Sequence, residues 1–172
     1  MRALARQRGF SLIEVLVAVL IFSLGLLGLA GLLVMATCSN QVAYLRTQAS
    51  FLAGSMADRM RANPNAVWAG TYNSSSYPLT GSQACTVASP CTPNQVALRD
   101  QYLWSTQLSQ FLPNVKATLQ CSNGTTPTTT QLLVRPPYAG NCVMTIAWAE
   151  RAAGDSSHAD AALQTYTWNF QP

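Results

Sequence analysis

Histidine and acidic residues are scarce in this chain. Its 172 residues include one histidine and six Asp or Glu side chains, against ten Lys or Arg. Hydrolytic catalysis usually needs a nucleophile, a base and an orienting group, and a metal site needs closely spaced ligands. The single histidine, His158, lies near Asp155 and Asp160 and is interpreted as part of a solvated loop. No phosphate-binding glycine loop is present in the polar part of the chain. We therefore expect no enzyme activity, no cofactor and no metal.

Positive charge is scarce outside the N-terminus. Arg2, Arg6 and Arg8 lie in the first nine positions, so residues 10–172 carry seven basic and six acidic side chains, a net charge of +1. Nucleic-acid-binding domains concentrate Lys and Arg on one face. Nucleic acid is therefore not expected to be a partner.

Charge is absent altogether between Glu14 and Arg46. The apolar block of residues 15–36 would span about 33 Å as a helix, enough to cross the core of a lipid bilayer. Arginines on its N-terminal side place residues 1–9 in the cytoplasm and the rest outside it. A lone carboxylate at this depth costs about a few kcal/mol, which favours a functional role for Glu14. The alternative is a tolerated charge that reaches the membrane interface.

The basic leader runs directly into Gly9, Phe10, Ser11, Leu12, Ile13 and Glu14. This order resembles the processing and assembly signal of type IV prepilins. The resemblance implies that a prepilin peptidase cuts between Gly9 and Phe10 and methylates the new Phe10 amine. Inside a filament core, Glu14 of one subunit could then neutralise the Phe10 amine of a neighbour, because an unpaired charge is costly in a low dielectric.

Two other interpretations of the N-terminus remain. A secretory signal could be cut after Ala36, and a lipoprotein signal before Cys38. The apolar block is longer than the usual secretory segment and carries Glu14, and Thr37 stands where a lipoprotein signal has a small residue. Within the block, the glycines either allow close helix packing or let the helix stretch locally when the subunit leaves the bilayer; they are Gly25, Gly28 and Gly31.

The helix is predicted to continue beyond the membrane to about Ala62. Apolar residues recur at spacings of three and four, which predicts one buried helix face; they are Val42, Leu45, Ala49, Leu52, Met56 and Met60. Asn63-Pro64 ends the pattern. We therefore expect a leader over residues 1–9, a membrane-spanning and assembly helix over 10–40, and a periplasmic head over 41–172.

The head is predicted to be an α+β domain, in which a small antiparallel sheet and one additional helix pack on the long helix. Residues 63–93 are turn-rich and are interpreted as a long loop. Thr92 and Pro93 predict the start of a helix over 94–112. Alternating patterns predict strands within about 115–170, over 115–121, 131–135, 142–148 and 165–170. The loop aromatics, which could be exposed for partner contact or pack back on the domain, are Trp68, Tyr72 and Tyr77.

The chain has five cysteines, four of them in the predicted periplasmic head, where disulfides can form. Sequence does not determine the connectivity. The simplest pairing is local, Cys85 with Cys91 and Cys121 with Cys142. Cys38 stands at the outer end of the apolar helix and is expected to be unpaired.

The whole layout resembles minor pilins of the PilV type, the pilus modification group. Beside the prepilin motif, the resemblance rests on the segments 56–63 and 100–113 and on the late strand that contains Trp148. It implies a low-abundance subunit with major and other minor pilins, prepilin peptidase, the inner-membrane assembly platform and the lipid bilayer as partners. Such a subunit helps to prime assembly or modifies the filament tip. The alternatives are a pseudopilin of a type II secretion system and a tip adhesin on the same scaffold.

Overall fold

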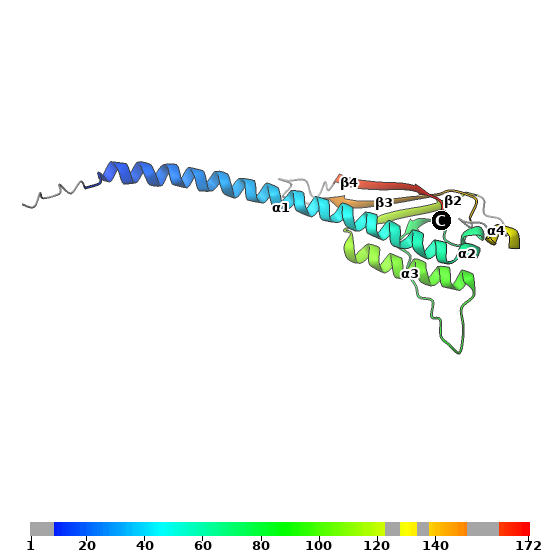
Figure 1. The fold of residues 1–172 in the computed structure, drawn as a ribbon. Coiled ribbons are helices and arrows are strands. Elements are labelled where there is room, and N and C mark those ends of the chain that lie inside the picture. Colours follow the sequence, from blue (N-terminus) through cyan, green and yellow to red (C-terminus); the bar gives the residue numbers. More distant parts are fainter. Residues whose placement is uncertain (1–8, 123–127, 134–137, 151–161) are drawn as a thin grey trace, which may run out of the picture. The chain divides into compact units, whose positions relative to one another are not determined.

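The computed structural model describes residues 9–122, 128–133, 138–150 and 162–172. The chain divides into two compact units, residues 1–40 and 41–172. Helix α1, Leu12–Ala62, contributes its first part to the first unit and its remainder to the second (Figure 1).

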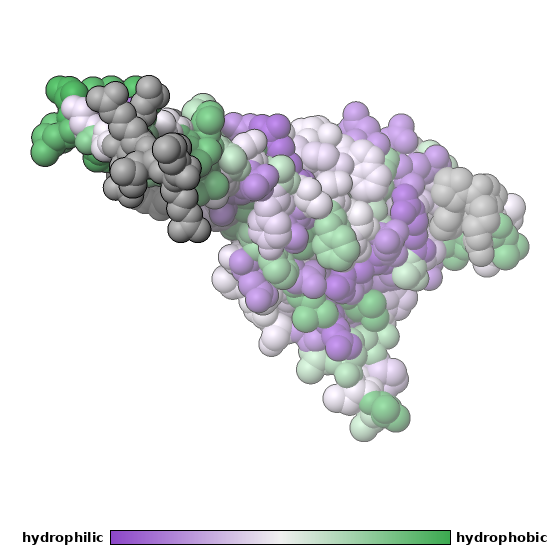
Figure 2. Space-filling view, turned by 60° about the vertical axis from the view of Figure 1, so that its left-hand side comes forward, coloured by the Kyte–Doolittle hydropathy of each residue, from purple (hydrophilic) through white to green (hydrophobic). Residues whose placement is uncertain are grey.

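The first unit is a single apolar helix with no core of its own. Every described residue from Gly9 to Thr37 is exposed, including Phe10 at 85% and Leu27 at 70%. By length and composition α1 could cross a membrane, and it is the one helix among the described residues that could. The N-terminal segment is coloured hydrophobic in Figure 2, whereas polar and apolar residues are interspersed over the visible face of the head.

The second unit is an α+β domain, as the sequence predicts. Its elements after α1 are α2 (Pro64–Trp68), β1 (Ser74–Tyr77), α3 (Pro93–Phe111), β2 (Lys116–Cys121), α4 (Thr129–Leu133), β3 (Cys142–Glu150) and β4 (Ala162–Phe170). The strands form one antiparallel sheet in the order β1-β2-β3-β4 (Figure 1). Its strands are joined in chain order, so neighbouring strands in the sequence are also neighbours in space.

The core forms where one face of this sheet and one face of α1 bury their apolar residues. Along β3, Met144, Ile146 and Trp148 are buried, and they alternate with more exposed residues. The buried residues on α1 are Leu45, Ala49, Leu52, Ala53, Met56, Ala57 and Met60. They recur at the spacing that brings residues to one side of a helix. The predicted apolar face is therefore the buried one, except that Val42 is only half-buried.

The interpretation of residues 63–93 as a long loop leaves out two short elements that form there. Pro64 opens the five-residue helix α2, where its missing N–H costs nothing. Ser74–Tyr77 forms the edge strand β1, whose Ser74 pairs with Leu119 of β2. A run of three serines has no alternating pattern, so its pairing is decided by the neighbouring strand.

The predicted strand over 131–135 is wrong for residues 131–133, which lie in a helix; residues 134 and 135 lie outside the described residues. The backbone N–H of Gln131 donates to Thr128 Oγ1 (3.3 Å), and Gln131 Oε1 accepts from the Thr128 N–H (2.7 Å). This reciprocal pair is a capping box, and it starts helix α4 at Thr129. The head therefore has short helices α2 and α4 in addition to the predicted helix, which is α3.

Candidate functional site

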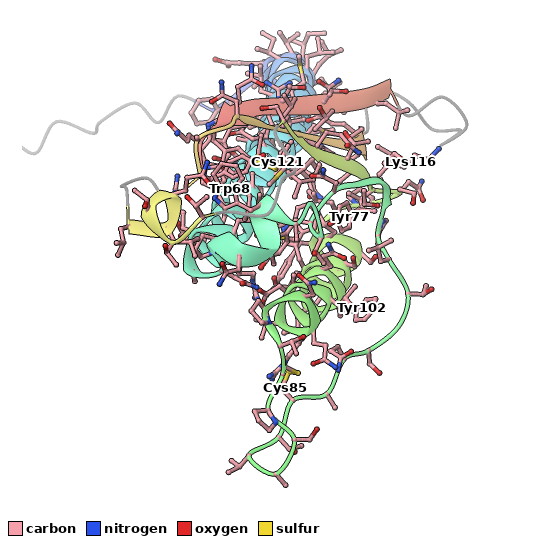
Figure 3. The ribbon with its side chains drawn as sticks, turned by 90° about the vertical axis from the view of Figure 1, so that its right-hand side faces the viewer. Trp68, Tyr77, Cys85, Tyr102, Lys116 and Cys121 are labelled. Carbon is pink, nitrogen blue, oxygen red and sulfur yellow. A yellow bond between two sulfur atoms is a disulfide. The ribbon has the colours of Figure 1, made fainter. Side chains whose placement is uncertain are left out.

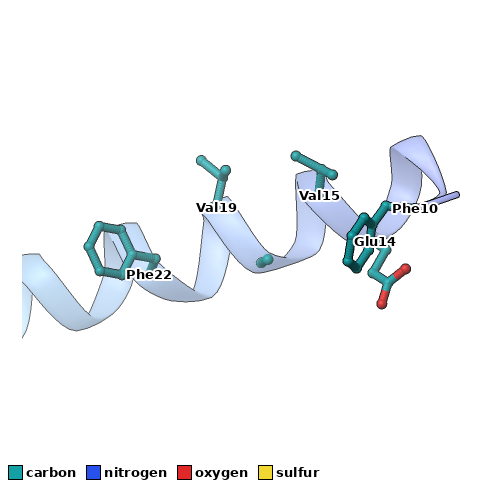
Figure 4. Close-up of a pocket in the computed structure, with 6 residues that line it drawn as sticks. Phe10, Glu14, Val15, Val19 and Phe22 are labelled. Atoms are coloured by element: carbon teal, nitrogen blue, oxygen red, sulfur yellow. The ribbon is translucent and has the colours of Figure 1, made fainter.

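The N-terminal stretch of α1 presents a shallow apolar groove, shown in Figure 4. Its lining residues are Phe10, Glu14, Val15, Ala18, Val19 and Phe22. They recur at intervals of three, four or one along the helix, so they share a broad face. In Figure 4, Val15 and Val19 project to one side of the helix and the Glu14 carboxylate to another.

Glu14 is exposed within this apolar surface. It lies in the first turn of α1, where a negative charge is favoured by the helix dipole. No ion pair joins Glu14 to another described residue of the chain. The groove therefore combines exposed apolar side chains with one carboxylate that is open to a cation from outside the described residues.

A polar network fastens the end of α1 to α3 in the head. Arg59 Nη1 donates to Asp100 Oδ1 (2.9 Å), and the Tyr72 hydroxyl donates to Asp100 Oδ2 (2.9 Å). Asn63 Nδ2 donates to the carbonyl of Pro93 (2.7 Å), just before α3 begins. Three segments far apart in the chain thus meet at one carboxylate.

The hydroxyl of Tyr72 is held protonated by its surroundings. Burial raises the pKa of Tyr72, and the charge of Asp100 beside it raises this pKa further. Burial likewise raises the pKa of Tyr77, whose hydroxyl donates to the Tyr72 carbonyl (2.8 Å). Both tyrosines therefore act as hydrogen-bond donors inside the head.

The aromatic residues of the predicted loop pack back on the domain. Trp68, Tyr72 and Tyr77 are all buried, so the interpretation of these residues as exposed contacts is wrong. Tyr77 meets Trp104 edge to face, with ring centroids 5.0 Å apart, and Trp104 Nε1 donates to the carbonyl of Leu52 (2.8 Å). The apolar surface of these aromatic side chains is therefore buried in the core of the head, which is the commoner role of aromatic side chains.

Two disulfides join Cys85 to Cys91 and Cys121 to Cys142, the two local pairings. Cys121 and Cys142 face each other across β2 and β3, and Cys142 is buried. In Figure 3, Cys85 lies on the loop that protrudes from the head, apart from Cys121 at the sheet. Cys38 forms no disulfide.

The acidic end of β3 is tied to α1. Glu150 Oε2 lies 3.9 Å from Arg46 Nη2, and the Glu150 side chain is buried whereas that of Arg46 is exposed. Asp155, His158 and Asp160 lie outside the described residues. Among the described residues, no group of three His, Cys, Asp or Glu could hold a metal ion.

The Arg59–Asp100–Tyr72 network was not predicted from the sequence. A signal for it exists, because no charged residue occurs between Arg61 and Arg99. Asp100 is thus an isolated carboxylate on a predicted helix, and Arg59 lies near the end of the preceding one. An Arg near the end of one predicted helix and an Asp within the next predicted helix are a reason to test whether the two helices pack together.

Two family models match consecutive parts of the chain. Residues 4–30 match the model described as the prokaryotic N-terminal methylation motif, and residues 31–102 match the model described as type IV pilin Tt1218. Searches of curated proteins and of solved structures return no match. The first match contains Gly9, Phe10 and Glu14, and the second contains Arg59 and Asp100.

Proposed function

We propose that this chain, which carries a prepilin N-methylation motif and a type IV pilin domain, is a minor pilin subunit of a type IV pilus, of the PilV type. One observation carries the proposal. An exposed apolar helix, led by Gly9 and Phe10, bears a single carboxylate at Glu14 that is exposed at its first turn. An uncovered surface of this kind is stable only in lipid or against other apolar helices.

In this proposal, prepilin peptidase cuts between Gly9 and Phe10 and methylates the Phe10 amine. Residues 10–40 hold the subunit in the inner membrane, with the head on the periplasmic side. The assembly platform then moves the helix from the bilayer into the filament. There the Phe10 amine of one subunit and Glu14 of its neighbour offset each other's desolvation. The subunit helps to prime assembly with major and other minor pilins, or modifies the filament tip.

The cut site is tested by the intact mass of the protein extracted from its native membrane. We expect a chain that begins at Phe10 and carries one added methyl group. A Gly9→Ala variant should retain residues 1–9, because the prepilin motif has glycine at the position directly before the cut. A Gly25→Ala variant is the matched control and should mature normally, since Gly25 lies beyond the cut site.

Two results would contradict the assignment. Normal maturation of the Gly9→Ala variant would show that the peptidase does not require Gly9. A wild-type mass that corresponds to a chain beginning near Thr37 or Cys38 would indicate a secreted protein or a lipoprotein. The assignment as a filament subunit would then be wrong.

A further inference from the structure

The four-stranded sheet of the head has two edge strands, β1 and β4, which differ in how they are protected from pairing with another chain. β1 is four residues long, its register with β2 is irregular, and Pro78 follows it directly. Short length, irregular pairing and proline are ordinary means of blocking a sheet edge. In contrast, β4 runs for nine residues in unbroken register with β3 and contains no charged residue and no proline. β4 is therefore the unprotected edge of this sheet.

The hydrogen bonds around β3 show which backbone atoms of β4 face the open side of the sheet. The Ala149 N–H donates to the carbonyl of Pro113, on the chain that leads into β2 (3.0 Å). The Asn141 carbonyl, just before β3, accepts from the N–H of Ser122, just after β2 (2.9 Å). Odd-numbered residues therefore bond on the side of β2. Because the bonding side alternates along an antiparallel strand, the even-numbered residues of β3 bond to β4.

The open side of β4 therefore carries a row of backbone groups that the sheet leaves unpaired. The even-numbered residues of β4 are the register partners of even-numbered residues of β3, as Trp168 is of Met144. The N–H and C=O groups that point away from β3 belong to Leu163, Thr165, Thr167 and Asn169. The hydroxyl oxygens of Thr145 and Thr167 are 3.4 Å apart, which agrees with this assignment because side chains approach more closely in non-hydrogen-bonded pairs. Among the described residues, no backbone hydrogen bond joins this side of β4 to another segment.

The side chains of β4 extend the two faces of the sheet toward this open side. Tyr166 and Trp168 belong to the face that packs on the core, yet both are only half-buried. Thr165 and Thr167 are exposed on the other face. A further strand beside β4 would cover the two aromatic rings on one face and would remain in solvent on the other. The edge therefore fits an extended segment in which apolar and polar residues alternate.

We propose that the open edge of β4 binds an extended segment of another protein as a fifth strand of the sheet. An extended polypeptide presents hydrogen-bond donors and acceptors at the spacing of the row on β4, so backbone pairing specifies the class of partner. Without a partner, an uncharged edge of this length favours uncontrolled association. The choice of a different protein over a second copy of this chain rests on the proposed function, because a minor pilin is expected in few copies. The pairing itself does not depend on that function.

Strand pairing is tested by photocrosslinking of the full-length chain in its native cells. A photoreactive benzoyl-phenylalanine is placed at position 163, 165 or 167, which share one exposed face of β4, and in a control at the exposed position 120 of the interior strand β2. We expect adducts with one segment of one other protein, mapped by mass spectrometry. The crosslinked position in that segment should move by two residues for each step along β4, because paired strands have the same rise per residue. Position 120 should give no adduct with that segment.

Three results would overturn the inference. The first is the absence of adducts from all three positions of β4. The second is a set of adducts scattered over a partner without the two-residue steps, which would indicate a contact other than strand pairing. The third is adducts with a second copy of this chain only.

Proline substitution separates backbone pairing from side-chain contact. Thr165→Pro removes an N–H that points to the open side and leaves the bonds between β4 and β3 in place, so the head should melt close to the wild-type temperature. The yield of adducts from position 167 should fall about tenfold or more in this variant. Thr165→Val keeps the N–H and should retain the wild-type yield. Equal yields in the two variants would contradict strand pairing.

The two-residue steps of the adducts are measured on chains without proline, so they test the pairing even if Thr165→Pro is unstable. The proposed function is tested separately by the mass of the mature chain. A mature chain that begins at Phe10 but gives no adducts from β4 would contradict strand pairing and leave the pilin function standing.

Discussion

At the scale of single residues, the head depends on a few polar side chains that join distant segments. Asp100 accepts from Arg59 and from Tyr72, which lie 41 and 28 positions away in the chain. The Arg59 and Asp100 side chains are 26% and 14% exposed. Loss of one partner in a part-buried pair leaves the other desolvated and unsatisfied, which is where the cost of such pairs arises.

Asp100→Asn should destabilise the head by about 1–3 kcal/mol, because Arg59 loses its charged acceptor while the shape of the side chain is retained. Asp58→Asn is the matched control. Its partner Arg61 is on the same helix and both side chains are largely exposed, so the loss should stay below about 1 kcal/mol. Chemical denaturation of the detergent-solubilised full-length protein measures both. Equal losses of stability in the two variants would show that the Arg59–Asp100–Tyr72 network contributes no more to stability than the exposed Asp58–Arg61 pair.

At the scale of the elements, the disulfides act on different parts of the head. Cys121 and Cys142 are register partners on β2 and β3, next to the core. Cys85 and Cys91 close a short segment in which Val87 is fully exposed. The first pair therefore restrains the sheet, and the second restrains only its own loop.

The Cys121→Ala/Cys142→Ala variant should lose more stability than Cys85→Ala/Cys91→Ala. In the chain-entropy account, the larger loop contributes about 3 kcal/mol and the smaller about 2 kcal/mol. The burial of Cys142 adds to the first loss, because Ala leaves part of its volume empty. Melting temperatures of the two full-length variants in the same detergent decide the order. An equal or reversed order would mean that the sheet holds its register without the covalent link.

Sequence patterns predicted the long elements and missed the short ones. Helix α3 begins at the Thr92 capping box, and β3 follows from its alternation, because both signals are local. In contrast, β1 exists because β2 offers it backbone partners, and its serines carry no pattern of their own. The strand prediction is wrong for residues 131–133 because a capping box at Thr128 and Gln131 outweighs an apolar run of a few residues.

The candidate sites divide in the same way. The prepilin motif lies within the six consecutive positions 9–14, so it can be recognised in the sequence without knowledge of the fold. The Arg59–Asp100–Tyr72 network joins residues of different elements, and only the packing of α1 and α3 in the head shows that these side chains meet. The local periodicity of the sequence does not show which distant elements are in contact.

At the scale of the whole molecule, the two units have different surfaces and different requirements. The head has a buried core, two disulfides and, on the face visible in Figure 2, a surface on which polar and apolar residues are interspersed. The first unit exposes every described residue from Gly9 to Thr37, nearly all of them apolar. In the proposed function, lipid covers such a helix before assembly and other helices cover it afterwards. An unpaired carboxylate would be costly among those helices, so we propose that Glu14 makes the choice of neighbour depend on charge.

Glu14→Ala should therefore leave processing intact and impair incorporation into filaments. The residues at the cut, Gly9 and Phe10, are unchanged, so the mature mass should still begin at Phe10 with one methyl group. The Phe10 amine of the neighbour would then be buried without its counter-charge, at a cost of several kcal/mol in a low-dielectric core. We expect the variant to accumulate in the membrane fraction and to be depleted from sheared filaments, as measured by quantitative immunoblotting. Glu14→Asp, which keeps the charge on a shorter side chain, should retain more incorporation than Glu14→Ala. If Glu14→Ala reaches filaments at the wild-type level, the Phe10 amine is neutralised in another way, and apolar packing alone recruits the subunit.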